Sequence, residues 1–286
     1  MTTALSSTLE LPGGVRIPQV GLGVFEVPSA EAQAVVEQAL EVGYRHIDTA
    51  AAYVNEEGVG AAVRASGLPR DELFVTSKLR NGDQGYDSTL RAYDDTCARL
   101  GLEALDLYLI HWPNPAAGLW QDSWRALQTL RRQGRVRAVG VSNFLVEHLE
   151  EIVPRADELP PEELPAVNQI EVHPTYQQPD VVAWCREHGV TVEAYSPLGR
   201  GADLEHPTVT TIADELGVTP AQIVLRWHLD KGHVVIPKTV SAERMRLNAT
   251  LADITLSPAQ LTDLDRLDSG ARTGNDPRTF SLSQIR

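Results

Sequence analysis

The chain has 286 residues, which is enough to bury a large core as two domains or as one α/β barrel. Its formal net charge of -14, with no block rich in Lys or Arg, argues against an extended nucleic-acid-binding surface. The sequence has no basic, apolar leader and no apolar run of about 18 residues, so we expect a cytoplasmic protein that does not enter a membrane. The two cysteines, Cys97 and Cys185, each fall in a helical pattern, which predicts reduced, buried thiols.

The first residues predict a β-hairpin. Two short alternating runs flank Pro12, Gly13 and Gly14 between residues 8 and 20. Pro18 has no N–H to donate to a neighbouring strand, so we expect this hairpin to lie outside the main sheet as a cover.

From residue 20 onward, strand-like apolar runs alternate regularly with amphipathic helical segments. The predicted strands cover residues 20–25, 45–48, 73–78, 105–111, 137–142, 166–172, 190–195 and 234–237. The predicted helices cover residues 29–42, 55–66, 87–100, 122–133, 145–152, 179–188, 206–216, 219–232, 241–251 and 257–267. The helix from residue 219 has the strongest start signal, because Thr219 and Gln222 have the spacing of a capping box around Pro220.

Eight strands that alternate with helices, without a linker or a change in composition, predict a closed (β/α)8 TIM barrel in preference to an open doubly wound sheet. We expect residues 1–286 to form a single domain of this kind. The hairpin would plug the amino-terminal mouth of the barrel, and the last helix would be additional to the repeating pattern. Active sites in this fold lie at the carboxyl ends of the strands.

Four residues with chemically useful side chains lie near the ends of three successive predicted strands: Asp48, Tyr53, Lys78 and His111. Each has an ordinary explanation when it is taken alone, as a helix cap, a packing residue, a solvated charge or a structural histidine. Their joint placement favours an active site. Lys78 would lower the pKa of the Tyr53 phenol, Asp48 would keep Lys78 charged, and His111 would orient a substrate oxygen. Such a set can donate a proton to a carbonyl oxygen during reduction.

The hydride for a reduction would come from a bound cofactor. Lys238 and Thr239 directly follow a predicted strand, and Arg244 begins the next helix, a combination that suits the 2′-phosphate of NADPH. The alternative is that these residues only belong to a charged helix surface. Further strand-end residues offer a ring face for a nicotinamide and amide or hydroxyl groups for its carboxamide, namely Tyr195, Ser142, Asn143 and Gln169.

The chain resembles the aldo-keto reductase family from about residue 9 to residue 280. The resemblance rests on eight stretches in order, which are GLGVF at 21–25, DTAAAYVNE at 48–56, TSKL at 76–79, LDLYLIHWP at 105–113, GVSNF at 140–144, NQIEVHP at 168–174, AYSPLGRG at 194–201 and IPKT at 236–239. It implies a barrel that binds NADPH without a Rossmann domain and reduces aldehydes or ketones. It also implies that Tyr53 is the proton donor, that Asp48 and Lys78 tune it, and that His111 positions the carbonyl.

The same resemblance assigns cofactor and substrate positions. The cofactor positions are Asp48, Ser142, Asn143, Gln169, Tyr195, Ser196, Leu198, Lys238, Thr239, Val240, Arg244 and Asn248. The substrate pocket positions are Val24, Phe25, His111 and Trp112. Leu247 departs from the family, which often has Glu there beside the adenine. The sequence ARTGNDPRTF at 271–280 is similar to the bacterial branch that includes 2,5-diketo-D-gluconate reductases.

Two other functions remain alternatives to an NADPH-dependent carbonyl reductase. One is a non-catalytic NADPH-binding sensor on the same barrel, and the other is an aldolase that forms a Schiff base at Lys78. For the reductase we expect a small aldehyde, an α-dicarbonyl or a keto-sugar as the substrate. No metal-binding cluster is visible in the sequence. No helix shows a second apolar stripe, so we expect a monomer.

Overall fold

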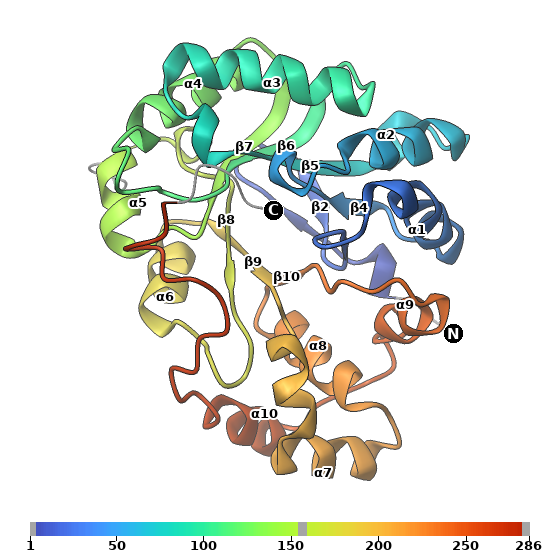
Figure 1. Cartoon of the computed structure of the whole chain (residues 1–286). Helices are drawn as coiled ribbons and strands as arrows, with labels where there is room; N and C mark the ends of the chain where they lie inside the picture. The colour runs from blue at the N-terminus through green and yellow to red at the C-terminus, as the bar shows by residue number, and fades with distance from the viewer. Residues whose placement is uncertain (1–3, 154–158, 282–286) are drawn as a thin grey trace.

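A computed structural model of the chain describes residues 4–153 and 159–281. Within these ranges, parallel strands pair with their neighbours in chain order, from the first barrel strand to the last (Figure 1). These strands are β3 (Leu22–Gly23), β4 (His46–Asp48), β5 (Phe74–Leu79), β6 (Leu105–Ile110), β7 (Val136–Ser142), β8 (Val167–Glu171), β9 (Thr191–Tyr195) and β10 (Val234–Val235). Parallel bridges from Val20 to Val235 and from Gly23 to Lys238 join the last strand to the first. The sheet therefore closes into the predicted (β/α)8 barrel.

Helices surround the strands (Figure 1). They are α1 (Ser29–Val42), α2 (Glu56–Ala65), α3 (Tyr86–Leu100), α4 (Trp120–Arg132), α5 (Val146–Ile152), α6 (Pro179–Glu187), α7 (Pro207–Leu216), α8 (Pro220–Asp230), α9 (Ala242–Ala249) and α10 (Pro258–Asp265). Short 3₁₀ segments are η1 (Ala4–Ser6), η2 (Ala51–Tyr53), η3 (Arg70–Glu72), η4 (Asn81–Asp83), η6 (Pro161–Glu163) and η7 (Gly199–Glu205). Strand and helix order agree with the sequence prediction, including the additional helix α10.

Local sequence explains where several elements begin and how deeply they are buried. At the start of α8, Thr219 and Gln222 form the predicted capping box, and Pro220 is the first helical residue. Every residue of β5 and of β6 is buried. Such continuous burial is typical of parallel strands that are covered by helices outside and by packed side chains inside.

The N-terminal hairpin consists of β1 (Thr8–Glu10) and β2 (Arg16–Pro18), which pair in an antiparallel manner. Leu11 and Ile17 are buried in one apolar cluster with Phe74, Val167 and Val234, the first residues of three barrel strands. The hairpin therefore covers the amino-terminal mouth, as predicted.

The two cysteines are free, and only one of them is fully buried. Cys185 on α6 is buried, whereas Cys97 on α3 is partly exposed, so the prediction of two buried thiols is wrong for Cys97. Amphipathic helices pack against a barrel with one face and leave the other in solvent, and Cys97 lies at the margin of that packed face. Among the described residues, no helix combines the length and the apolar character that crossing a membrane requires.

Candidate active site

The four predicted catalytic side chains meet at the carboxyl ends of neighbouring strands. Asp48 is the last residue of β4, Lys78 is the next to last residue of β5, and His111 directly follows β6. Tyr53 is the last residue of η2, the turn that follows β4. Because β4, β5 and β6 pair in parallel in this order, their carboxyl ends lie at one edge of the barrel.

Lys78 is fully buried and all three of its N–H groups have acceptors. Its Nζ atom lies 2.5 Å from Asp48 Oδ1, 2.9 Å from the carbonyl oxygen of Thr49 and 3.4 Å from the Tyr53 hydroxyl. Burial alone would lower the pKa of Lys78, but its acidic neighbours, Asp48 first and then Tyr53, together outweigh burial and the pKa is raised. Burial also raises the pKa of Asp48, whereas Lys78 and the Gln169 amide lower it. With both donors directed at its oxygens, Asp48 carries the negative charge of the pair.

The Tyr53 phenol keeps its proton at neutral pH. Burial raises its pKa, and the nearby Lys78 ammonium lowers it only in part. The net direction is opposite to the one predicted from sequence, because the sequence shows the cation but not how completely the hydroxyl is removed from water. A protonated phenol next to a cation is suited to giving up a proton, since the ammonium stabilises the phenolate that remains.

His111 lies beside Tyr53. The two rings are 5.6 Å apart and nearly perpendicular. Burial and the Lys78 charge lower the pKa of His111 well below its usual range, so its imidazole is neutral. Its Nδ1 atom is buried without a hydrogen-bond partner in the described residues. The Asn143 side chain donates to the backbone carbonyl of His111 and thereby ties β6 to the loop after β7.

The predicted nicotinamide-binding side chains form one hydrogen-bonded network. Ser142 donates to the backbone carbonyl of Gln169, Asn143 donates to the Ser142 hydroxyl, and the Tyr195 hydroxyl donates to Asn143 Oδ1. Gln169 Nε2 lies 2.8 Å from Asp48 Oδ2, which connects this network to the Lys78 ion pair. All four side chains line the same cavity as Tyr53 and His111.

This cavity has a volume of about 180 Å³ and a largely apolar lining. Phe25 and Trp112 line it, and Phe280 of the C-terminal segment packs on Trp112 with ring centres 4.3 Å apart and ring planes tilted by 45°. Val24 does not line it. Its side chain is fully buried in the hydrophobic core, so the sequence assignment of Val24 to the substrate pocket is wrong. The chain turns directly after Val24, where the backbone N–H of Val27 donates to the Val24 carbonyl oxygen, and Phe25 within this turn faces the cavity.

A second groove continues from the cavity and contains the predicted phosphate-binding residues. It has a volume of about 410 Å³ and shares Phe25, Ser196, Arg200 and Lys238 with the cavity. Leu198 and Arg244 also line the groove. Among the described residues, neither Lys238 nor Arg244 forms an ion pair within the chain, so both cations are available to a ligand phosphate.

The other predicted cofactor residues lie nearby on the same segment. Thr239 is buried and its hydroxyl accepts a hydrogen bond from the backbone N–H of Ser241. Val240 is half-exposed, and Asn248 is buried on α9.

Sequence reasoning missed the contacts that hold the C-terminal segment against the site. Glu171, the last residue of β8, accepts hydrogen bonds from the backbone N–H groups of Thr273 and Gly274. His173 bridges Glu171 at 3.2 Å and Asp203 of η7 at 2.9 Å. Glu171 and His173 belong to the NQIEVHP stretch at the carboxyl end of β8. Titratable residues at a strand end were the sequence signal that could have marked them as site residues.

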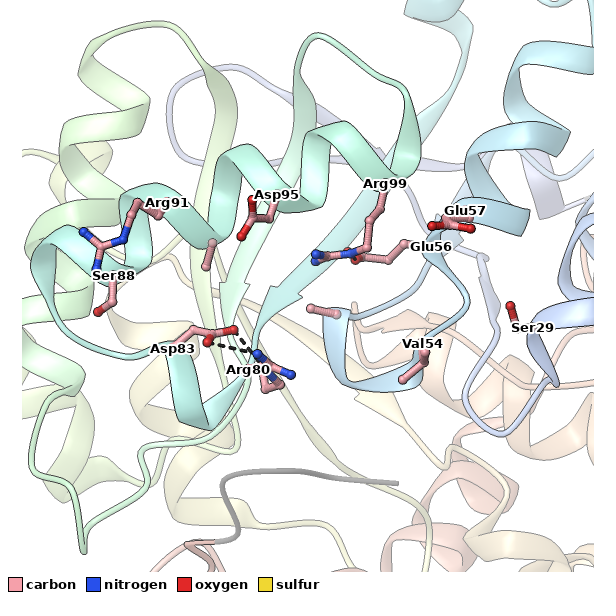
Figure 2. A pocket seen from close by; sticks show the side chains of 12 residues that line it. Ser29, Val54, Glu56, Glu57, Arg80, Asp83, Ser88, Arg91, Asp95 and Arg99 are labelled. Atoms are coloured by element: carbon pink, nitrogen blue, oxygen red, sulfur yellow. Dashed lines mark hydrogen bonds and ion pairs between the residues drawn. The ribbon is translucent and has the colours of Figure 1, made fainter.

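A larger cavity of about 440 Å³ lies on another side of η2 (Figure 2). Ala51 and Val54 line it, but none of the four predicted catalytic residues does. Two ion pairs neutralise part of its charged lining: Arg80 bonds Asp83 at 3.0 Å, and Arg99 bonds Glu56 at 2.6 Å. We therefore place the active site in the smaller cavity, where unpaired polar atoms and titratable groups converge.

Comparison with known proteins decides the family. The sequence model of the Aldo/keto reductase family matches residues 18–269. The chain belongs to this family. An aldo-keto reductase of Mycolicibacterium smegmatis is 46% identical over 279 residues, covering 98% of this chain and 100% of the relative. Glyoxal reductase of Bacillus subtilis is 45% identical over 278 residues, which cover 97% of this chain and 98% of that relative. The crystal structure of a Gox0644 mutant in complex with NADPH matches with a TM-score of 0.90 at 41% identity, covering 96% of this chain and 99% of that one.

As an aldo/keto reductase, the protein is an NADP-dependent oxidoreductase that acts on carbonyl compounds. The groove fits NADPH on chemical grounds, because its free cations suit a phosphate and the cavity it joins presents hydroxyl and amide groups. Lys78 does not line the cavity, and its three N–H groups are all used. An amine in this state is a poor nucleophile, which disfavours the aldolase alternative.

Proposed function

We propose that the protein reduces a small aldehyde or α-dicarbonyl compound, with Tyr53 as the proton donor. The observation that carries this proposal is the position of the Tyr53 phenol, which lines the cavity and lies 3.4 Å from the Lys78 ammonium. NADPH held in the groove would supply the hydride for the new C–H bond and would thereby be oxidised to NADP⁺. The phenol gives its proton to the carbonyl oxygen as negative charge develops there, and the product is an alcohol.

Three residues around Tyr53 assist this proton transfer, each in a different way. Lys78 stabilises the phenolate that remains after transfer, because an ammonium beside the oxygen favours its charged form. Asp48 holds Lys78 in place through the 2.5 Å contact. His111, which is neutral, hydrogen-bonds to the carbonyl oxygen and sets its direction toward Tyr53.

The cofactor contacts are part of the same proposal. Lys238, Thr239 and Arg244 hold the 2′-phosphate, and Tyr195 offers its ring to the nicotinamide. Ser142, Asn143 and Gln169 hold the carboxamide of the nicotinamide through their amide and hydroxyl groups. The remaining contacts along the cofactor come from Asp48, Ser196, Leu198, Val240 and Asn248.

The size and lining of the cavity favour small carbonyl compounds. The nicotinamide would share the cavity of about 180 Å³ with the substrate, so the space that remains beside Phe25, Trp112 and Phe280 favours a short carbon skeleton. The similarity to a glyoxal reductase agrees with an α-dicarbonyl substrate.

Turnover by the Tyr53→Phe variant tests the proposal. We predict that kcat falls by about 10²–10⁴-fold, because the proton donor is lost while the ring remains. NADPH affinity, measured by fluorescence titration, stays near that of the wild type. The substrates are methylglyoxal, an aromatic aldehyde and a diketo-sugar acid. Turnover of each is measured by the oxidation of NADPH.

Tyr86→Phe is the matched control, because Tyr86 is an exposed phenol on α3. It is expected to keep wild-type turnover. Retained activity in Tyr53→Phe would contradict the proton-donor role. Tight NADPH binding by a wild-type protein that turns over no carbonyl in the panel would instead contradict reductase function.

A further inference from the structure

Glu193 is a fully buried carboxyl group inside the barrel, next to the ion pair of the active site. It lies on β9, and its Oε2 atom accepts a 2.8 Å hydrogen bond from Gln169 Nε2. The same Nε2 atom donates to Asp48 Oδ2 at 2.8 Å. One side-chain amide therefore bridges two carboxyl groups. No role in the proposed reaction accounts for the second of these.

The surroundings of the other Glu193 oxygen indicate that it carries a proton. Oε1 is buried without a hydrogen bond and lies 3.5 Å from His46 Nε2, which is itself 3.2 Å from the Thr76 hydroxyl. His46 Nδ1 faces the backbone carbonyl of Pro18 at 3.3 Å, and a carbonyl can only accept, so Nδ1 holds the hydrogen. Burial lowers the pKa of His46 to about 3, so its ring is neutral and Nε2 presents a lone pair. The Thr76 hydroxyl faces the same Nε2 atom. An ionised Oε1 would meet no donor on this ring, whereas a protonated Oε1 can share the Nε2 lone pair with Thr76.

Charge balance points the same way. The charged groups that face Glu193 across the barrel are Asp48 and Lys78, which already neutralise each other. A second carboxylate beside Asp48 would be unpaired in a site that excludes water. Burial and the Asp48 charge accordingly raise the pKa of Glu193 to about 8.

The bridge also fixes the direction of the Gln169 amide. Both of its N–H groups are given to carboxyl oxygens, so the carbonyl Oε1 is the only hydrogen-bonding group that Gln169 can offer a ligand in the cavity. Without Glu193, one N–H would lose its partner and the amide could turn over. In the proposed function this amide holds the nicotinamide carboxamide, whose NH₂ group needs an acceptor.

We propose that Glu193, held as a neutral acid, is a positioning residue that directs the Gln169 carbonyl toward the nicotinamide and keeps a second negative charge out of the site. The proposal rests on the proposed function, in which Gln169 contacts the cofactor. Oxidised nicotinamide is positively charged and reduced nicotinamide is neutral. Ionisation of Glu193 therefore favours NADP⁺ over NADPH.

The first test compares cofactor affinities across pH. In the wild type, the dissociation constant of NADP⁺ divided by that of NADPH is expected to fall roughly tenfold as pH rises through about 8. The fall means that NADP⁺ binding becomes tighter relative to NADPH binding. Glu193→Gln keeps an acceptor for Gln169 and an N–H donor for His46, but it cannot ionise. Its ratio is expected to stay constant over the same range. The same pH dependence in wild type and Glu193→Gln would overturn the proposal.

The second test removes the acceptor. Glu193→Leu is expected to weaken NADPH binding roughly tenfold at pH 7. Glu193→Gln, which keeps the acceptor for Gln169, is expected to bind NADPH as tightly as the wild type. Circular dichroism first establishes that each variant is folded. If Glu193→Leu is unfolded, the pH dependence of cofactor affinity in Glu193→Gln still tests the proposal. Asp106→Asn is the matched control, because Asp106 is a buried carboxyl near the amino end of β6. Wild-type NADPH affinity in a folded Glu193→Leu would contradict the positioning role.

A third measurement does not depend on the cofactor. The infrared spectrum of the ligand-free wild type at pH 7 should contain a protonated carboxylic acid band that is absent from Glu193→Gln. Identical carboxylic acid bands in the two proteins would overturn the inference. If the band is present but wild type binds no NADPH, the proposed function fails while the protonation of Glu193 stands.

Discussion

At the scale of single residues, the site depends on a buried ammonium whose hydrogen bonds are all satisfied. A buried lysine normally loses its charge, because leaving water costs more than one partner returns. Lys78 keeps its charge since three oxygens surround it, from Asp48, Thr49 and Tyr53. The Tyr53 phenol, the proposed proton donor, is thus one of the groups that stabilise the Lys78 ammonium.

We predict that Lys78→Met lowers the free energy of unfolding by about 3–5 kcal/mol, because it leaves the Asp48 charge buried without a partner. Urea denaturation measures this. Lys231→Met is the control, since Lys231 pairs with Asp265 at the surface, and it is expected to change stability by less than about 1 kcal/mol. The double variant Lys78→Met, Asp48→Asn should recover part of the loss. Equal effects at Lys78 and Lys231 would contradict the argument.

At the scale of elements, a chain of charged groups joins the two segments that cover the site. Glu171 holds the turn at Thr273 and Gly274, and His173 connects it to Asp203 of η7. Gly274 lines the substrate cavity, and η7 lines the cofactor groove. A Cβ atom on Gly274 would lie 2.7 Å from Glu171 Oε2, so glycine permits this close contact. The position of the C-terminal segment is therefore coupled to that of η7.

The pH dependence of this chain follows from its pKa values. Burial opposes the charge on His173, but its hydrogen bonds to Asp203 and Glu171 outweigh burial and raise its pKa from 6.5 to about 9. Its contribution to stability is complete below pH 6.5 and is lost as pH rises through about 9. The pKa of Glu171 is lowered from 4.5 to about 2 by hydrogen bonds from His173 and the Thr273 turn, which outweigh burial. Its contribution is present above pH 4.5 and is lost as pH falls through about 2.

We predict that the Tm of the wild type exceeds that of His173→Gln most clearly near pH 6, and that the difference shrinks as pH rises through about 9. Thermal unfolding followed by circular dichroism measures both proteins across pH. Glu205→Gln, an exposed residue of η7, is expected to show the wild-type profile. A difference in Tm between the wild type and His173→Gln that does not change with pH would show that the charge on His173 does not contribute to stability.

At the scale of the whole molecule, few large apolar side chains are exposed in the part of the chain that the structure describes. They come from different segments of the chain: Phe25, Val54, Tyr86, Leu119, Leu216 and Val240. Phe25 faces the substrate cavity, which gives it a separate reason to be exposed. A stable subunit interface normally requires a contiguous apolar core.

We therefore predict a monomer that unfolds as one domain. Light scattering coupled to size-exclusion chromatography at micromolar concentration should give a mass near 31.3 kDa. Calorimetry should show one cooperative transition, because the barrel strands share a continuous core. A mass twice as large would contradict the first expectation, and two separate transitions would contradict the second.

Much of the architecture was predictable because it follows from short-range patterns. Regular alternation of apolar strands and helices predicts a barrel, and the parallel order of strands then places their carboxyl-end residues together. This is why Asp48, Lys78 and His111 could be grouped without coordinates. Glu193 could have been noticed as a carboxyl within an apolar strand run, but its partners His46 and Gln169 come from other strands.

The order of elements, the barrel and the chemical types of the active-site residues are determined by the sequence alone, since periodicity and strand-end position are local properties. Tertiary structure decides the protonation of Tyr53 and Glu193, because desolvation depends on every segment packed around a group. It also decides that Val24 turns into the core and that the C-terminal segment closes the cavity. These features depend on contacts between residues far apart in the chain, and no local pattern encodes them.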